Sequence, residues 1–216
     1  MSLWFFIQWL RSATFFDPRL VLVASYGVVW LPLIFAIVIA SVRGGLSPSR
    51  KIMGLRITWF DVFLGLGAGL LLRAVAGLIE IGLTGRMVGL GVTFGDPVYD
   101  SWWLFGTIVA PVIVAPIVEE IFFRGLLQKS SGRVLTLRLG QRTALSLSVI
   151  LSATTFALLH LMEAANPTAA LMLGLSTFIL GLATATLSAT TGRIGAPLIA
   201  HIAFNATLVV PSLLAI

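Results

Sequence analysis

The sequence predicts an all-α fold, a polytopic bundle of about six transmembrane helices with an additional N-terminal helix in the membrane interface. Hydrophobic residues make up 58% of the 216 residues, charged residues make up 10%, and the mean hydropathy is +1.06. The apolar residues gather in runs of about 20, the length that an α-helix needs to cross the hydrocarbon core. Because no soluble domain needs this balance, we expect residues 1–216 to form a single integral, multi-pass membrane domain. The membrane is expected to be that of a prokaryotic cell.

Short segments rich in glycine, proline and basic residues separate the expected helices. The N-terminal helix, Trp4 to Phe16, is too short to span the membrane and is expected at its surface. The six spans are expected at about Leu20 to Val42, Trp59 to Leu83, Trp102 to Leu127, Thr143 to Met162, Thr168 to Thr190, and from Pro197 onward.

The second span contains two features that bear on helix packing. Gly65 and Gly69 are four residues apart and permit the close approach of another helix. Arg73 and Glu80 share a helix face, but they lie about 10 Å apart along the axis. We therefore expect no direct bond between these two charges and interpret both as structural.

Basic residues predict the orientation of the chain. The connections 43–56 and 129–142 carry four lysines or arginines each, and Arg193 adds one. Nine basic residues therefore lie on the side of the membrane that these connections share, and three lie on the opposite side. Since such residues concentrate in cytoplasmic loops, the segment from Gln128 to Arg142 is expected to be a cytoplasmic loop and both termini to be external. The net charge of +6 then reflects topology, and we expect no nucleic-acid partner.

Two adjacent glutamates and an arginine interrupt the third span, in the stretch Glu119-Glu120-Ile121-Phe122-Phe123-Arg124. Ionisable residues at membrane depth are costly and are kept where they pair or act. Glu120 and Arg124 share a helix face and should form an ion pair. Glu119 lies about 100° around the helix and has no cation one turn away, so we interpret it as the reactive group. The alternative, that all three residues form one structural ion network, stays open.

The chain has two histidines, His160 and His201, and both lie within expected spans. His201 and Asn205 are four residues apart and share a helix face. These residues suit acyl chemistry, in which Glu119 takes a proton from water, one histidine assists, and the other histidine and Asn205 donate to an oxyanion. Glu119, His160 and His201 would equally suit a zinc ion with an open fourth position. The residues alone leave both readings open.

Three motifs on separate helices resemble the CPBP family, which comprises type II CAAX prenyl endopeptidases and bacteriocin-processing or self-immunity (Abi) proteins. They are Glu-Glu-x-x-x-Arg from Glu119, Phe-x-x-x-His ending at His160, and His-x-x-x-Asn ending at Asn205, within a core of about residues 102–210. The resemblance implies an intramembrane glutamic endopeptidase without a cofactor, acting on a membrane-embedded or lipid-anchored peptide or protein.

The resemblance also implies a role for each motif residue. Glu119 and His160 would activate water, and His201 and Asn205 would stabilise the oxyanion. Glu120 and Arg124 would be structural, in agreement with the helical argument. The chain is short at its N-terminal end compared with the eukaryotic prenyl proteases, so a prenyl requirement stays open.

Other classes of protein remain as alternatives. A non-enzymatic membrane immunity or scaffold protein would need Glu120 and Arg124 for folding but would tolerate the loss of Glu119. A transporter is disfavoured because the sequence has no paired repeats. The His-Glu-x-x-His signature of other proteases is absent from the sequence. No pattern indicates an oligomeric state.

The expected helix ends conflict with the expected site. Glu119 lies about eight residues, or roughly 12 Å, from the cytoplasmic end of its span, and His160 lies about 17 residues, or roughly 26 Å, from the same side. These two residues can meet only if the segment from Gln128 to Leu147 dips into the membrane or the fourth helix starts deeper.

Overall fold

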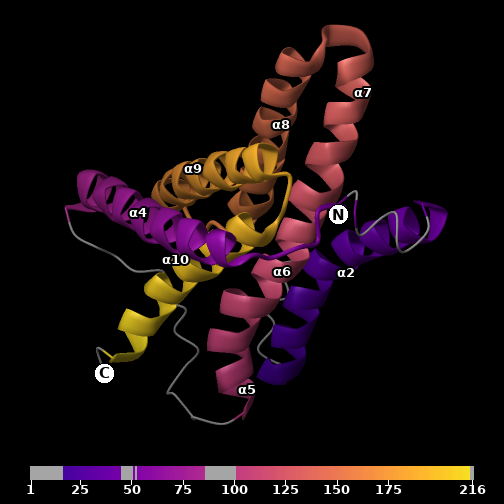
Figure 1. The fold of residues 1–216 in the computed structure, drawn as a ribbon. Helices are drawn as coiled ribbons and strands as arrows, with labels where there is room; N and C mark the ends of the chain where they lie inside the picture. The colour runs from indigo at the N-terminus through magenta and orange to yellow at the C-terminus, as the bar shows by residue number, and fades with distance from the viewer. Residues whose placement is uncertain (1–16, 45–50, 52, 86–100, 215–216) are drawn as a thin grey trace.

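The computed structural model describes residues 17–44, 51, 53–85 and 101–214, and the elements within these ranges are helices without strands (Figure 1). Five helices are long and apolar enough to cross a membrane: α2 (Pro18–Gly44), α4 (Trp59–Thr84), a continuous helix over Ser101–Leu139, α8 (Gln141–Leu161) and α9 (Pro167–Thr191). The sixth, α10 (Gly195–Leu214), has a shorter apolar stretch, Gly195–Val209. The predicted all-α membrane fold is thus confirmed, and the expected helix Trp4 to Phe16 lies outside the described residues.

The third helix runs through five segments without a break. They are α5 (Ser101–Leu104), the π-helix η1 (Phe105–Val114), α6 (Ala115–Glu120), the π-helix η2 (Ile121–Gln128) and α7 (Lys129–Leu139). The expected cytoplasmic loop from Gln128 to Arg142 is therefore wrong. This segment is polar and basic but contains no proline, so nothing interrupts the helix before Gly140. Gly140 turns the chain with a φ of 76°, a conformation that favours glycine, and α8 follows directly.

The hairpin of α7 and α8 explains how Glu119 and His160 reach the same depth. The two helices pack side by side and extend together beyond the rest of the bundle (Figure 1). Glu119 precedes Gly140 by 21 residues and His160 follows it by 20. At ~1.5 Å per residue both lie roughly 30 Å from the turn. The conflict between the expected depths came from placing the end of the third helix at Leu127.

Small residues allow α4 and α10 to pack closely, as the spacing of Gly65 and Gly69 predicted. A Cβ atom added to Gly65 would lie 2.7 Å from the carbonyl oxygen of Ala196, and one added to Gly69 would overlap the carbonyl oxygen of Ala200. Such distances are too short for non-bonded atoms, so only glycine fits at either position. This contact places α10, and with it His201 and Asn205, against the bundle.

The expectation that Arg73 and Glu80 do not bond is wrong. Two nitrogens of the Arg73 guanidinium donate to the two carboxylate oxygens of Glu80, at 2.8 and 3.3 Å. The separation of about 10 Å along the axis applies to the backbone, whereas both side chains are long and extend along the helix toward each other. The bidentate pair satisfies both charges within one helix.

A second ion pair joins α4 to the turn before α10. Arg193, which the sequence presented only as a cytoplasmic charge, donates to both carboxylate oxygens of Asp61, at 3.0 and 2.9 Å. The hydrogen bond to Asp61 raises the pKa of Arg193 above its ordinary value, so this group stays charged. Asp61 also accepts from the backbone of Thr58 and closes a capping box at the start of α4.

The orientation of the bundle can be tested at the turn between α7 and α8. A reporter inserted at Gly140 should read as cytoplasmic and one placed after Ile216 as external, because the basic residues concentrate at the first end. Fluorescent-protein and alkaline-phosphatase fusions report the two sides with opposite signals. Reversed signals at both positions would overturn the orientation.

Candidate active site

The candidate site lies where the third helix, α8 and α10 meet, and the two π-helices flank its glutamates. Single π-helical turns occur often at functional sites, because the wider winding changes the register of the side chains. In η1 the backbone N–H of Ala115 donates to the carbonyl of Ala110, five residues earlier. The carbonyl of Pro111 would then need the N–H of residue 116, which is a proline and has none. The sequence and the winding together therefore leave the Pro111 carbonyl free.

Asn205 on α10 donates a hydrogen bond to this carbonyl. Its side-chain nitrogen Nδ2 donates to the Pro111 oxygen at 2.8 Å. An asparagine amide has two N–H groups, so one remains for another acceptor. The bond fixes the orientation of the amide relative to the helix that carries Glu119. The spacing of the motifs gave no sign of this contact, which joins residues 94 apart.

Glu119 is buried, and its carboxylate faces both histidines. Its Oε2 atom lies 3.9 Å from Nε2 of His160 and 3.8 Å from Nε2 of His201. These distances are too long for direct hydrogen bonds, and Oε2 has no hydrogen-bond partner among the described residues. Glu119, His160 and His201, which the sequence analysis selected, are thus brought together.

The backbone of α8 sets the tautomer of His160. Its Nδ1 atom lies 2.9 Å from the carbonyl oxygen of Phe156, one turn earlier. A carbonyl only accepts, so Nδ1 carries the proton of this bond. In the neutral ring Nε2 then has a free lone pair, and this atom is the one that faces Glu119. His160 and Glu119 therefore present two acceptors to the space between them.

The second glutamate binds the other histidine. Glu120 is fully buried, and its Oε1 lies 2.9 Å from Nδ1 of His201 and 3.2 Å from the Arg124 guanidinium. The predicted ion pair of Glu120 and Arg124 is confirmed. Arg124 also donates to the carbonyl of Gly181 and to the hydroxyl of Thr184 on α9. Glu120 therefore connects the ion pair directly to a site histidine, a contact that no local spacing indicates because the two residues are 81 apart.

Phe156 lies at the centre of these groups. Its ring is fully buried, lies 4.4 Å from the ring of His160 and meets His201 edge-on at 5.5 Å. The Arg124 guanidinium lies over its face at 4.5 Å, which is cation–π distance. The sequence marked Phe156 only as a motif position. Its ring holds both imidazoles and the guanidinium in place.

The zinc alternative finds no support in the arrangement of the donors. Among the described residues, no three His, Asp or Glu side chains are placed so that they could hold a metal ion. We therefore derive the chemistry of the site from the side chains alone.

A comparison with protein families adds an independent finding. The model of the type II CAAX prenyl endopeptidase Rce1-like family matches residues 101–207. These residues form an Rce1-like domain of the type II CAAX prenyl endopeptidase family. The family resemblance seen in the motifs is thereby confirmed, and no curated protein and no solved structure matches the chain.

A domain of this family over residues 101–207 implies a protease with a protein or peptide substrate. The matched range runs from α5 to just beyond Asn205 and so contains every residue of the candidate site. Together with the apolar helices, this describes an enzyme that is a polytopic membrane protein with a buried network of glutamate and histidine.

Proposed function

We propose that this protein hydrolyses a peptide bond of a membrane-embedded or lipid-anchored peptide or protein, with water that Glu119 and His160 activate. The observation that carries the proposal is the convergence of Glu119 Oε2 with Nε2 of His160 and of His201, at 3.9 and 3.8 Å. A carboxylate beside an acceptor nitrogen is the arrangement that general-base catalysis on water requires.

The first step uses the two acceptors. A water molecule about 2.8 Å from both Glu119 Oε2 and His160 Nε2 donates one hydrogen to each. Glu119 takes one proton as the water oxygen attacks the carbonyl carbon of the substrate. The hydrogen bond from His160 Nδ1 to Phe156 keeps Nε2 in the accepting form. The attack forms a tetrahedral intermediate with a negative oxygen.

Two donors on α10 are available for that oxygen. The free N–H of Asn205 is one, since the other is bound to the Pro111 carbonyl. His201 is the second, but its Nδ1 proton is directed at Glu120, so Nε2 donates only when the ring is doubly protonated. The negative charge of Glu120 balances that imidazolium. Glu120 therefore has a positioning role for His201 in addition to its pairing with Arg124.

Collapse of the intermediate completes the reaction. The C–N bond breaks and the leaving amine receives the proton that Glu119 took from water. The products are a carboxylic acid and an amine, which balances the addition of one water to one peptide bond.

We expect the purified protein to keep its peptidase activity after metal removal. Purified protein in liposomes should cleave a prenylated membrane peptide, or its unprenylated counterpart, after exhaustive chelation and with no stoichiometric metal by elemental analysis. A zinc ion held by Glu119, His160 and His201 would be lost to a strong chelator. Activity that disappears on chelation and returns with zinc would contradict the proposed mechanism, and cleavage of neither peptide would contradict the proposed substrate class.

Asn205→Ala should lower kcat by a factor on the order of 10²–10³, because one oxyanion donor is lost. The variant also frees the Pro111 carbonyl, which should cost about 1 kcal/mol of stability. Thermal unfolding measured beside the kinetics separates the two effects. An unchanged kcat in the folded variant would remove Asn205 from the oxyanion hole.

A further inference from the structure

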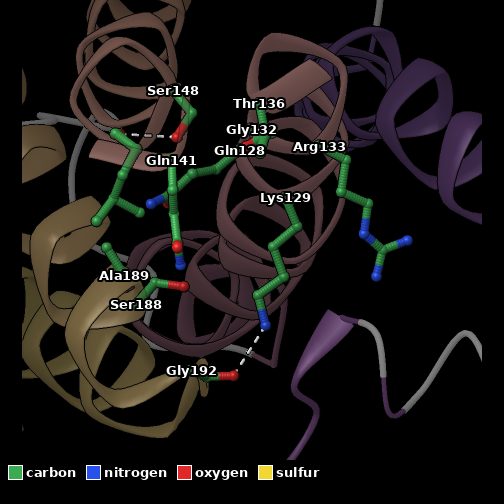
Figure 2. Close-up of a pocket in the computed structure, with 11 residues that line it drawn as sticks. Gln128, Lys129, Gly132, Arg133, Thr136, Gln141, Ser148, Ser188, Ala189 and Gly192 are labelled. Atoms are coloured by element: carbon green, nitrogen blue, oxygen red, sulfur yellow. Dashed lines mark hydrogen bonds between the residues drawn. The ribbon is translucent and has the colours of Figure 1, made fainter. Parts of the chain in front are cut away.

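A cavity lies away from the active site, where α7, α8 and α9 meet (Figure 2). It has a volume of about 360 Å³, and the side chains that define it are Gln128, Lys129, Arg133, Gln141, Ser148 and Ser188. None of the four proposed catalytic residues lines it. The cavity is thus a separate feature with its own chemistry.

Two buried polar atoms at this cavity have no partner among the described residues. Ser188 is 1% exposed, and its hydroxyl oxygen makes no hydrogen bond. Gln128 is 3% exposed; its amide nitrogen donates to the Ala185 carbonyl at 2.9 Å, but its amide oxygen is unbonded. Buried polar groups in native proteins are nearly always hydrogen-bonded, because an unpaired one is costly. Both residues line the cavity, so its wall contains one unpaired hydroxyl and one unpaired amide oxygen just beneath the accessible surface.

The charge at the cavity is positive. Lys129 and Arg133 are four residues apart and share a face of α7. The ammonium of Lys129 uses one of its three N–H groups for the Gly192 carbonyl, at 2.9 Å, while Arg133 extends outward at the rim (Figure 2). No acidic residue is among the described residues that line the cavity. An anion is the occupant that this charge favours.

We propose that this cavity binds the phosphate ester of an alcohol with free hydroxyl groups, as in the glycerol phosphate headgroup of phosphatidylglycerol. The phosphate oxygens accept from Lys129 and Ser188, with Arg133 at the rim, and a glycerol hydroxyl donates to the free oxygen of Gln128. The site lies at the basic end of the bundle, which the distribution of lysine and arginine assigns to the cytoplasmic surface. Basic cavities between transmembrane helices on that side are suited to anionic lipid headgroups. Free glycerol phosphate has the same chemistry and is the other source.

The experiment measures thermal unfolding of the purified full chain in a neutral detergent, without reference to protease activity. Phosphatidylglycerol should raise the Tm with a saturable dependence on concentration, and phosphatidylcholine should not. The double variant Lys129→Gln/Arg133→Gln should weaken the apparent affinity on the order of tenfold. Arg138→Gln is the matched control, since Arg138 lies exposed on the same helix but does not line the cavity.

Ser188→Ala provides a second, independent readout. Without lipid it should not lower the Tm, because its hydroxyl has no partner to lose. With phosphatidylglycerol it should reduce the Tm shift. Stabilisation by soluble glycerol phosphate as well would identify a soluble ligand, and stabilisation by the lipid alone would identify the headgroup. The proposal would be overturned if phosphatidylcholine raised the Tm as much as phosphatidylglycerol, or if neither phosphatidylglycerol nor glycerol phosphate raised it. It would also be overturned if both the Lys129→Gln/Arg133→Gln and Ser188→Ala variants kept the full Tm shift, or if Arg138→Gln weakened the affinity as much as the double variant.

Discussion

Glu119→Gln should abolish peptide-bond hydrolysis and leave the fold intact. Glutamine has nearly the same shape as glutamate, and the Oε2 atom has no hydrogen-bond partner among the described residues to lose. An amide cannot take a proton from water, however. General-base catalysis contributes about 10²–10⁴-fold, so we expect a loss of at least about 10³-fold in kcat, measured on a membrane peptide with purified protein in liposomes.

Two controls make this result specific. The Tm of Glu119→Gln should match that of the unaltered protein. The same chemical change at Glu80, a buried carboxylate that pairs with Arg73 on α4, should leave kcat per folded molecule unchanged, because α4 carries none of the four proposed catalytic residues. Normal cleavage by Glu119→Gln would exclude both the glutamate mechanism and a zinc site built on Glu119. A protein that acts as an immunity factor or scaffold would also tolerate this change.

Glu120→Ala or Arg124→Ala should each destabilise the protein by about 3–5 kcal/mol, because each leaves the other charge buried without its partner. Both side chains are fully buried, at 0% exposure. The structure adds a second consequence, since Glu120→Ala also removes the partner of His201 Nδ1. The measurement is the yield and thermal stability of each variant in detergent.

The double variant Glu120→Ala/Arg124→Ala is the matched control for the ion pair. It removes both charges together, so its loss of stability should be smaller than the sum of the two single losses. Glu120→Gln separates the roles further, because its amide oxygen still accepts from His201 but no longer balances an imidazolium. Normal stability in both single alanine variants, with loss of activity alone, would show that the pair is not structural.

The sequence by itself determined the class of fold and the local pairing within each helix. Runs of about 20 apolar residues specify transmembrane helices because only helices satisfy the backbone in lipid. The ion pair of Glu120 and Arg124 and the close approach at Gly65 and Gly69 follow from the period of one helix. The motif residues also selected Glu119, His160, His201 and Asn205 as a group, and all four lie within the residues that the family model matches.

The sequence was less reliable where composition suggested a loop. The basic segment from Gln128 to Arg142 has the residues of a cytoplasmic connection, yet without proline it continues as a helix to Leu139. Side-chain reach was a second difficulty, because Arg73 and Glu80 bond across a distance that the backbone rise alone does not allow. Composition along the chain did not show where the third helix ends, and the backbone rise did not show which side chains reach each other.

Only the tertiary structure decided how the groups of the site meet. The turn at Gly140 brings His160 level with Glu119, and α10 packs so that His201 reaches Glu120 and Asn205 reaches the Pro111 carbonyl. These contacts join residues 81 and 94 apart, whereas helical periodicity relates only residues within a turn or two. The physical reason is that the period fixes the direction of a side chain around its own helix, while packing between helices fixes which other helix it faces.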